Sequence, residues 1–479
     1  MISLNRKNLS EIAASGIEVP TYPLKYQHRI CHIGVGGFHR AHQAYYLHKL
    51  LQEQKGEGWG ICGIGLMPAD KAMHDLLHKQ DFLYSLWAMG TKNKTVSIVG
   101  SIMDHIDAYN DKQKALDSLA DEATKIVSLT ITEKGYCLQK NGELDLTNPL
   151  IAGDLKNFDN PTSAIGFVTK ALALRKEKNI KPFTVMSCDN LVENGHQAKK
   201  AILDFAKHID SELAKWIGSC VTFPLSMVDR ITPAPQKTRI ENLCRDWGVQ
   251  DEGLLVCEDW LQWVLEDSFC NGRPPLELAG VQMTADVKPY EDMKVGLLNG
   301  SHSALSYYGL LKGYVRVDEA IRDVNIQQWL RAYMIQVAGT LAPVQGIDVS
   351  KYQDALIERY SNTNIEDRLL RLAEDGSAKF QQTLLPALKK LLNTNGDFRF
   401  LASAIANWIV YLEGLSQNEA AAAQYRDPMK DQLIALAVQS INREDAKPFI
   451  KAVFGLSDKD TDTFSAQVQD YVRGILKKE

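Results

Sequence analysis

Short apolar runs rich in β-forming residues alternate with helical stretches through roughly the first 285 residues, and then the strand pattern stops. The strongest strand candidates, rich in Ile, Val, Thr and Phe, are residues 30–35, 59–66, 125–132 and 182–187. Amphipathic segments lie between them, for example residues 42–54, 112–120 and 161–176. This alternation predicts a mostly parallel sheet with helices on both faces.

The later part of the chain is helical in pattern. Apolar residues recur at helical spacing along one stripe, and further helical patterns cover residues 432–438 and 463–476. The stripe consists of Leu401, Ala404, Ile405, Trp408, Ile409 and Leu412. The sequence therefore predicts an α/β domain over residues 1–285, followed by an all-helical domain over residues 286–479.

Composition excludes several classes of protein. The formal net charge of -5 gives no basic field for nucleic acid or an anionic membrane, and no apolar stretch is long enough to span a bilayer. The N-terminus lacks the apolar core of a secretion signal. The eight cysteines are scattered, with no CxxC pair, which favours reduced thiols over disulfides or a zinc site. A cytoplasmic protein is expected.

A glycine-rich turn follows the first strand candidate. Gly34, Gly36 and Gly37 stand between that strand and an amphipathic segment. A strand, a tight glycine turn and a helix start form a cradle for the pyrophosphate of a dinucleotide, because glycine lets the backbone approach the phosphates. The match is incomplete, since His39 occupies the place of the third glycine in G-x-G-x-x-G. A plain strand-to-helix turn explains the spacing equally well.

An acidic residue follows the second strand candidate. Asp70 would accept hydrogen bonds from a ribose 2′-hydroxyl and repel a 2′-phosphate, which favours NAD over NADP. The cationic Lys71 is adjacent to Asp70, so NADP is not excluded as a cofactor. The alternative is that Asp70 caps the helical run at residues 71–79.

Three polar residues cluster in an apolar segment of the later domain. On a helix at 100° per residue, Lys294, Asn299 and His302 share one broad face. A desolvated lysine tends to lose its proton and can act as a general base, while amide N–H groups can stabilise a developing alkoxide. The cluster thus indicates oxidation of an alcohol without a metal. The alternative is a surface lysine and a hydrogen-bonded core histidine.

Several segments, taken in order, resemble the polyol-specific long-chain dehydrogenases, the mannitol dehydrogenase family, over nearly the whole chain. The matching segments are residues 34–43, 128–136, 183–190, 221–233, 263–274 and 294–302. Lys134 departs from the family pattern, because relatives carry glycine there. The resemblance implies a Rossmann-like N-terminal domain, a helical C-terminal domain, NAD as cofactor and no metal. Many members act as monomers, so a monomer is expected.

The resemblance also implies roles for individual residues. Lys294 matches the catalytic acid/base, Asn190 and Asn299 match the alkoxide-stabilising pair, and His302 matches a residue that hydrogen-bonds the substrate. Glu291 matches a carboxylate that exchanges the lysine's proton with solvent; an exposed carboxylate at a helix start is the alternative. The nucleotide turn of the family maps onto Gly34, Val35, Gly36, Gly37 and Phe38, with Asp70 at its acidic position. Ala69 replaces a neighbouring acid of a close relative, which weakens the preference for NAD.

Four further residues match substrate-contacting positions of the family: Val228, Asp229, Arg371 and Lys379. From the residues alone, Asp229 is equally explained by an ion pair with Arg230, and the other two charges by an ordinary surface.

The resemblance leads us to expect reversible, NAD-dependent oxidation of D-mannitol to D-fructose. Fructuronate reduction, in which D-mannonate is the product, and D-arabinitol or sorbitol oxidation are the alternatives within the family. A catalytically inert NAD- or sugar-binding regulator is the alternative from another class.

Overall fold

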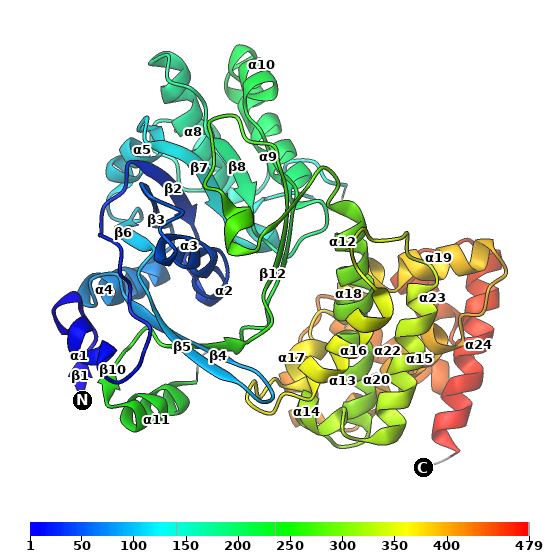
Figure 1. Ribbon diagram of the computed structural model, residues 1–479. Helices are drawn as coiled ribbons and strands as arrows, with labels where there is room; N and C mark the ends of the chain where they lie inside the picture. The colour runs from blue at the N-terminus through cyan, green and yellow to red at the C-terminus, as the bar shows by residue number, and fades with distance from the viewer. Residues whose placement is uncertain (140, 235, 478–479) are drawn as a thin grey trace. The chain divides into compact units, whose positions relative to one another are not determined.

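The chain divides into two compact units, Met1–Val287 and Lys288–Glu479. The structure is a computed structural model that describes residues 1–139, 141–234 and 236–477. All the strands in this described part belong to the first unit, and the second unit is built from helices (Figure 1).

A five-stranded parallel sheet forms the centre of the first unit. The strand order is β6-β3-β2-β7-β8, with β2 in the middle. The bounds are β2 (His28–Ile33), β3 (Trp59–Gly65), β6 (Ile102–Asp107), β7 (Thr124–Leu129) and β8 (Thr184–Ser187). The chain adds strands first on one side of β2 and then on the other. In sheets of this kind, ligands bind outside the carboxyl ends of the strands at that point of reversal.

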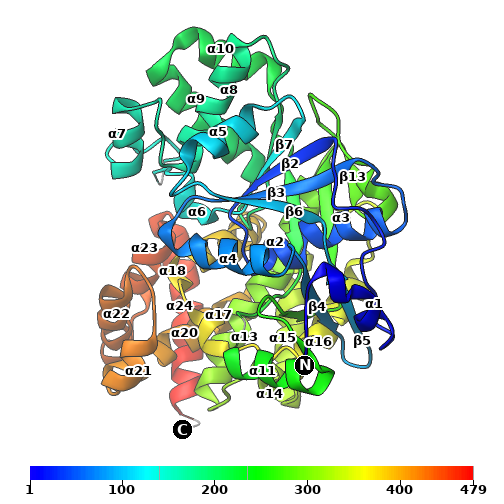
Figure 2. The ribbon, with the colours of Figure 1, turned by 90° about the vertical axis from the view of Figure 1, so that its left-hand side faces the viewer.

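Each face of this sheet has its own apolar core. On one face, Cys62, Val127 and Leu129 are fully buried under a layer of helices (Figure 2). That layer consists of α5 (Lys112–Ala120), α8 (Ala164–Glu177), α9 (Asn194–Ile209) and α10 (Ser211–Cys220). On the other face, Ile61 and Ile126 are fully buried against α3 (Gln43–Gln52) and further strands. Strand side chains alternate between faces, so each strand contributes to both cores.

Three smaller sheets complete the first unit. The sheet β11-β4-β5 contains β4 (Tyr84–Met89), β5 (Lys94–Val99) and β11 (Leu255–Glu258). The sheet β13-β12-β9 contains β9 (Ser226–Asp229), β12 (Gln262–Glu266) and β13 (Gln282–Thr284). The pair β1-β10 joins β1 (Ile2–Ser3) to β10 (Val249–Gln250). The remaining helices are η1 (Arg6–Asn8), α1 (Leu9–Ala13), α2 (Gly37–Ala41), η2 (Pro68–Asp70), α4 (Lys71–Lys79), α6 (Thr132–Gly135), α7 (Pro149–Lys156), α11 (Lys237–Trp247) and η3 (Leu276–Ala279).

The second unit is organised around two buried helices, α13 (Gly300–Leu311) and α20 (Arg399–Ser416), which pack against each other. Ala404, Ile405 and Trp408 of α20 are fully buried. The other helices are α12 (Lys288–Met293), η4 (Lys294–Asn299), α14 (Val317–Ala320), α15 (Val324–Ala338), α16 (Val349–Tyr360), α17 (Leu369–Ala373), α18 (Gly376–Thr383), α19 (Leu385–Asn393), α21 (Glu419–Gln424), α22 (Lys430–Asn442), α23 (Lys447–Phe454) and α24 (Asp458–Leu476).

The predicted fold class is confirmed, with two differences in detail. The four strand candidates correspond to β2, β3, β7 and β8. The amphipathic segment predicted over residues 42–54 begins earlier and is broken at His42, whose φ of -119° and ψ of -90° interrupt the helix between α2 and α3. The second face of the main sheet is covered by strands as well as a helix, because β4, β11 and β12 share its core.

Candidate functional site

The glycine turn after β2 is shaped by its contact with the end of β7. Gly34 has a φ of +96°, and a Cβ there would lie 2.2 Å from the carbonyl oxygen of Thr130. The hydroxyl of Thr130 donates to the carbonyl of Gly34 over 2.7 Å. Only glycine fits this position, because both the backbone conformation and the space exclude a side chain. At Gly36, in contrast, a Cβ would meet nothing closer than 3.9 Å, so the backbone is open to a close-approaching ligand.

His39 fills the place of the missing third glycine by stacking on a strand residue. Its ring lies parallel to the ring of His32, with centroids 3.5 Å apart and an interplanar angle of 8°. His32 contacts Ser128 Oγ at 2.8 Å and Thr130 Oγ1 at 2.9 Å, which ties β2 to β7. Burial lowers the pKa of His32 to about 3 and that of His39 well below its usual value. Both rings are therefore neutral near pH 7 and stack without charge repulsion.

Asp70 closes the turn after β3 and does not cap the following helix. Its Oδ2 accepts a hydrogen bond from the backbone N–H of Met67 over 2.9 Å, and its side chain makes no capping bond to α4. The interpretation of Asp70 as the N-cap of the helix at residues 71–79 is therefore wrong, and its side chain instead caps the start of η2. A Cβ at Gly65 would lie 2.5 Å from the Cβ of Asp70, so this glycine lets the acid lie against the strand end. Lys71 is paired with Asp75 over 2.8 Å.

Asn190 lies in the loop between β8 and α9, immediately after a buried carboxylate. Asp189 accepts hydrogen bonds from the backbone N–H groups of Ile131 and Thr132, over 3.0 and 2.9 Å, and from the hydroxyl of Tyr136 over 2.7 Å. Burial raises the pKa of Asp189, and these hydrogen bonds oppose the rise. The carboxylate thus joins the ends of β7 and β8. Asn190 itself is exposed.

Val228 and Asp229 lie on β9 and are buried, at 4% and 3% exposure. This strand runs antiparallel to β12, where Val228 is opposite Trp263 and Asp229 is opposite Gln262. The neighbouring guanidinium of Arg230 donates to two carbonyl oxygens, those of Glu258 and Ala41.

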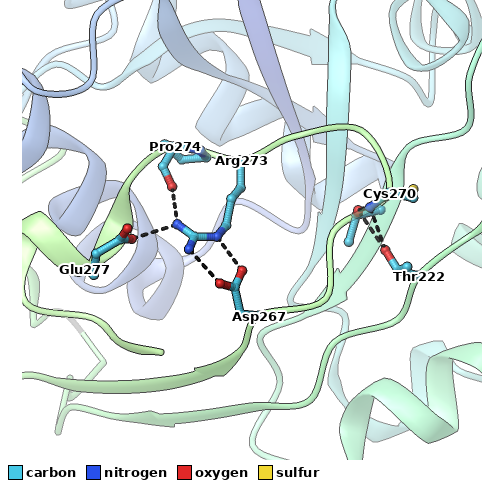
Figure 3. Close-up of polar contacts among 7 residues, drawn as sticks. Thr222, Asp267, Cys270, Arg273, Pro274 and Glu277 are labelled. Atoms are coloured by element: carbon cyan, nitrogen blue, oxygen red, sulfur yellow. Dashed lines mark hydrogen bonds and ion pairs between the residues drawn. The ribbon is translucent and has the colours of Figure 1, made fainter. Parts of the chain in front are cut away.

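The family-like segment after β12 has a structural role at its arginine. Arg273 lies between two carboxylates, and its guanidinium contacts Asp267 at 2.7 and 2.9 Å and Glu277 at 2.7 Å (Figure 3). The backbone N–H of Cys270 donates to Thr222 Oγ1 over 3.1 Å in the same segment. These contacts engage the guanidinium of Arg273, so the role of this side chain is to hold the conformation of the segment.

In the second unit, the predicted helix through Lys294 is a π-helix. η4 covers Lys294–Asn299 and continues into the α-helix α13, which carries His302. The angles expected for an α-helix therefore do not apply between Lys294 and Asn299, because i→i+5 bonding widens the turn. Single π turns inside helices occur frequently at functional sites. Lys294 is only 5% exposed, so the interpretation of this residue as a surface lysine is wrong.

Glu291 is also buried. It is 6% exposed and lies 3.7 Å from the amine of Lys288, so it is not the exposed helix-start carboxylate that was the alternative. Asn299 is half-buried, and its carbonyl accepts from Ser303 Oγ over 3.2 Å.

The electrostatic environment of His302 is cationic. Burial lowers its pKa well below the usual value, and the charges of Arg371, Arg359, Lys379 and Lys294 lower it further. Its ring packs on Tyr360 with centroids 4.4 Å apart. Within the described part of the chain, His302 Nε2 has no hydrogen-bond partner, so the interpretation of this residue as a hydrogen-bonded core histidine does not hold for that atom. A neutral ring with one unsatisfied nitrogen is suited to bind a hydroxyl group.

Arg371 and Lys379 are held by specific contacts. Arg371 forms a bidentate pair with Asp367, at 2.8 and 2.5 Å. The amine of Lys379 donates to the carbonyl of Leu372 over 3.0 Å, and burial, followed by the charge of Arg371, lowers its pKa. The structure thus brings Lys294, His302, Arg371 and Lys379 into one charged environment.

Sequence reasoning did not find three residues of these surroundings. Asp189 and Asn194 hold the loop of Asn190, and Arg359, 7% exposed, contributes to the charge around His302. Asp189 directly precedes Asn190 in the sequence, and this adjacency was the available signal. Arg359 gives no signal, because an arginine in the last turn of a helix is ordinary.

In the described residues, no group of three His, Cys, Asp or Glu side chains is placed to hold a metal ion. All eight cysteines are free thiols. None of the described helices has both the length and the apolar character needed to span a bilayer.

Family models cover most of the chain. Residues 28–278 match the model of the mannitol dehydrogenase Rossmann domain, and residues 286–476 match that of the mannitol dehydrogenase C-terminal domain.

Individual relatives carry different names. The chain is 42% identical to a D-mannonate oxidoreductase of Escherichia coli over 439 residues, which is 90% of this chain and 89% of the relative. It is 39% identical to a mannitol 2-dehydrogenase of Emericella nidulans, over 95% of this chain and 93% of the relative. A solved structure of Pseudomonas fluorescens mannitol 2-dehydrogenase, a ternary complex with NAD and D-mannitol, covers 100% of both chains with 40% identity and a TM-score of 0.87.

Proposed function

Because this chain belongs to the mannitol dehydrogenase family and is therefore an oxidoreductase, we propose that it oxidises D-mannitol reversibly at carbon 2 to D-fructose, with NAD and without a metal. The buried Lys294, next to a neutral His302, is the observation that carries the proposal. Support comes from the likeness, along the whole chain, to a protein solved with NAD and D-mannitol.

In the proposal, the domain of residues 1–285 holds the cofactor and the domain of residues 286–479 supplies proton transfer. The residues that would hold the dinucleotide are Gly34, Val35, Gly36, Gly37, Phe38 and Asp70. They fit such a ligand, because the backbone at Gly36 is open and a carboxylate stands at the end of β3. When bound, NAD would accept the hydride that leaves the carbinol carbon.

The proton chemistry is assigned to the chain's own groups. Lys294, in its uncharged form, accepts the hydroxyl proton during oxidation and returns it during reduction. The side-chain amides of Asn190 and Asn299 stabilise the developing alkoxide. His302 hydrogen-bonds a substrate hydroxyl, and Glu291 exchanges the amine's proton with solvent.

Four residues are proposed to bind the rest of the polyol. Val228 and Asp229 lie on a buried strand, and Arg371 and Lys379 are fixed by an ion pair and a carbonyl contact. Groups held in this way lose little conformational entropy when they bind a ligand.

A second candidate function is fructuronate reduction, which yields D-mannonate. Two observations favour it: the 42% identity to a D-mannonate oxidoreductase, and the cationic side chains Arg359, Arg371 and Lys379 around His302. Cations stabilise a substrate carboxylate, although they also donate hydrogen bonds to hydroxyls.

A substrate panel separates these candidates. D-mannitol, D-arabinitol, D-sorbitol and D-mannonate are each offered with NAD and then with NADP, and the reduced nicotinamide is followed by absorbance. We expect D-mannitol with NAD to give the highest kcat/KM. D-mannonate as clearly the best substrate would replace the first proposal by the second. Turnover of none of them, with NADH still bound, would favour the inert regulator.

We also propose that the protein acts as a monomer, as many family members do. Light scattering after size-exclusion chromatography measures this, and a mass near 53.5 kDa is the expected result. A stable mass of twice that value would contradict it.

A further inference from the structure

A buried asparagine connects two parts of the first unit that carry proposed site residues. Asn194 is the first residue of α9 and is fully buried. Its amide nitrogen donates to the carbonyl of Asp189 over 3.0 Å and to the carbonyl of Ser226 over 2.7 Å. Its amide oxygen accepts from the backbone N–H of Ser226 over 3.1 Å. One side chain thus holds the loop of Asn190 against the first residue of β9.

The chemistry of the side chain matches this task. The contact requires two donated hydrogen bonds and one accepted hydrogen bond at fixed positions. A primary amide supplies both kinds of group, whereas a carboxylate has no donor and a hydroxyl has only one. Asparagine at position 194 is therefore specified by the backbone groups around it.

The next residue allows the close approach. A Cβ at Gly195 would lie 2.6 Å from the carbonyl oxygens of both Phe223 and Pro224. The first turn of α9 therefore packs directly on the backbone that leads into β9. The small residue and the amide act together, because the amide reaches Ser226 only when the backbones are this close.

The loop between β8 and α9 is consequently fixed at both ends. At its start, the carboxylate of Asp189 holds the backbone of Ile131 and Thr132. At its end, Asn194 holds Ser226, which is three residues before Asp229 on β9. The exposed Asn190 lies between these anchors.

We infer that Asn194 is a positioning residue, which sets the place of Asn190 relative to Asp229 and through it the choice among polyols. The inference rests on the proposed function, in which Asn190 stabilises the alkoxide and Asp229 contacts a hydroxyl of the same substrate. A shift of about 1 Å between groups that bind one substrate lowers the rate of the reaction by up to about a hundredfold. It also reduces discrimination between substrates that differ in one hydroxyl configuration.

A second buried amide provides a matched control. Gln80 donates to the carbonyl of Leu83 over 2.9 Å and to a carboxylate oxygen of Asp251 over 2.7 Å, and it accepts from the N–H of Glu252 over 2.8 Å. It is 4% exposed and follows α4. Like Asn194 it donates two hydrogen bonds and accepts one, although one of its acceptors is a carboxylate, and none of its partners is a proposed site residue.

The test compares Asn194→Asp with Gln80→Glu, each of which replaces an amide by a carboxylate of the same shape. Q80E is the harsher change, because its new carboxylate also meets the buried carboxylate of Asp251. Steady-state kinetics are measured well below the melting temperature, on the substrate that the wild type uses best. We expect kcat/KM to fall about tenfold to a hundredfold in N194D and less than about twofold in Q80E. We also expect the ratio of kcat/KM for D-mannitol and D-sorbitol to move toward one in N194D alone, while the Kd of NADH stays unchanged.

Equal kinetic losses in the two variants would overturn the inference, because a merely structural amide accounts for them. If N194D does not fold, Asn194→Ala and Gln80→Ala replace the pair, since they remove the hydrogen bonds without adding a charge.

Hydrogen exchange tests the anchoring without any turnover. We expect amides of residues 189–193 and 226–229 to exchange faster in N194D than in wild type, with no change there in Q80E. Unchanged exchange at these amides would overturn the inference even if the enzyme is active. If wild type turns over no substrate of the panel, the proposed function fails while the exchange result still decides whether Asn194 anchors the loop.

Discussion

The glycine turn of the first unit and the Lys294–His302 segment of the second are built by different means. Backbone contacts shape the turn: Gly34 is pressed against the carbonyl of Thr130. Burial and charge shape the segment: Lys294 is 5% exposed, and the charges of Arg359, Arg371 and Lys379 act on His302. A substitution in the turn is therefore expected to act through a steric clash. A substitution in the Lys294–His302 segment is expected to act through loss of a functional group. Substitutions in the two regions should therefore affect different measurements.

The largest effect is expected at Lys294. Lys294→Ala removes the proposed base, and kcat should fall by about 10²–10⁴-fold, because general acid–base catalysis contributes that much. NADH binding, followed by fluorescence, should persist. Lys390→Ala is the control, since this lysine contacts the carbonyl of Thr340 on the surface of the same unit. An unchanged turnover in the Lys294 variant would remove the proposed base from the mechanism.

The next effect concerns the stability of the turn. Gly34→Ala forces a side chain into a φ of +96° and onto the carbonyl of Thr130. The backbone conformation alone should lower the free energy of unfolding by about 1–3 kcal/mol, and the clash should add to this loss. Gly37→Ala is the comparison, because its Cβ would make an ordinary contact at 3.6 Å with Leu255. Thermal melting measures both, and equal stability of the two variants would contradict the steric account.

A smaller effect is expected from the pH dependence of stability. The pKa of His302 lies below its value of 6.5 in the unfolded chain, chiefly through burial, so the unfolded state binds the extra proton first. The stabilisation is fully present above about pH 6.5 and is lost as the pH falls below that value, at up to about 1.4 kcal/mol per pH unit. His302→Gln should reduce this slope of unfolding free energy between pH 6.5 and 5. His196→Gln, which replaces an exposed histidine, is the comparison variant.

The smallest effect is expected in the choice of cofactor. Asp70→Asn keeps an acceptor for the N–H of Met67 but removes the charge that repels a 2′-phosphate. We expect the ratio of kcat/KM for NADP over NAD to rise about tenfold, which corresponds to about 1.4 kcal/mol. Asp75→Asn, which releases Lys71 from its ion pair, should raise the same ratio by less. No change in the first variant would show that another group selects the cofactor.

The parts of the fold that follow from local pattern were predictable. Apolar runs predicted β2, β3, β7 and β8, and the spacing of Ala404, Ile405 and Trp408 predicted α20. The smaller sheets were not predicted, because their pairing joins distant segments, for example Leu86 with Leu255. No local signal identifies such a partner.

The candidate site was predictable to a similar extent. Motif order selected Lys294, Asn299 and His302, and the structure shows that Lys294 and His302 are buried. The direction of the Asp70 side chain was not predictable, because capping and turn closure require the same residue type at the same place. The π turn at residues 294–299 was not predicted either, since apolar spacing over six residues does not distinguish it from an α-helix.

That π turn carries a consequence for changes in chain length. An i→i+5 turn contains one residue more than an α-helical turn, so removing one residue from η4 can restore an ordinary helix with its hydrogen bonds complete. Since either turn passes once around the axis, the helices before and after η4 would keep nearly the same rotation relative to each other, and only the side chains inside the turn would be redirected. A deletion among residues 295–298 would therefore change the spacing of Lys294 and Asn299 while leaving a well-folded protein.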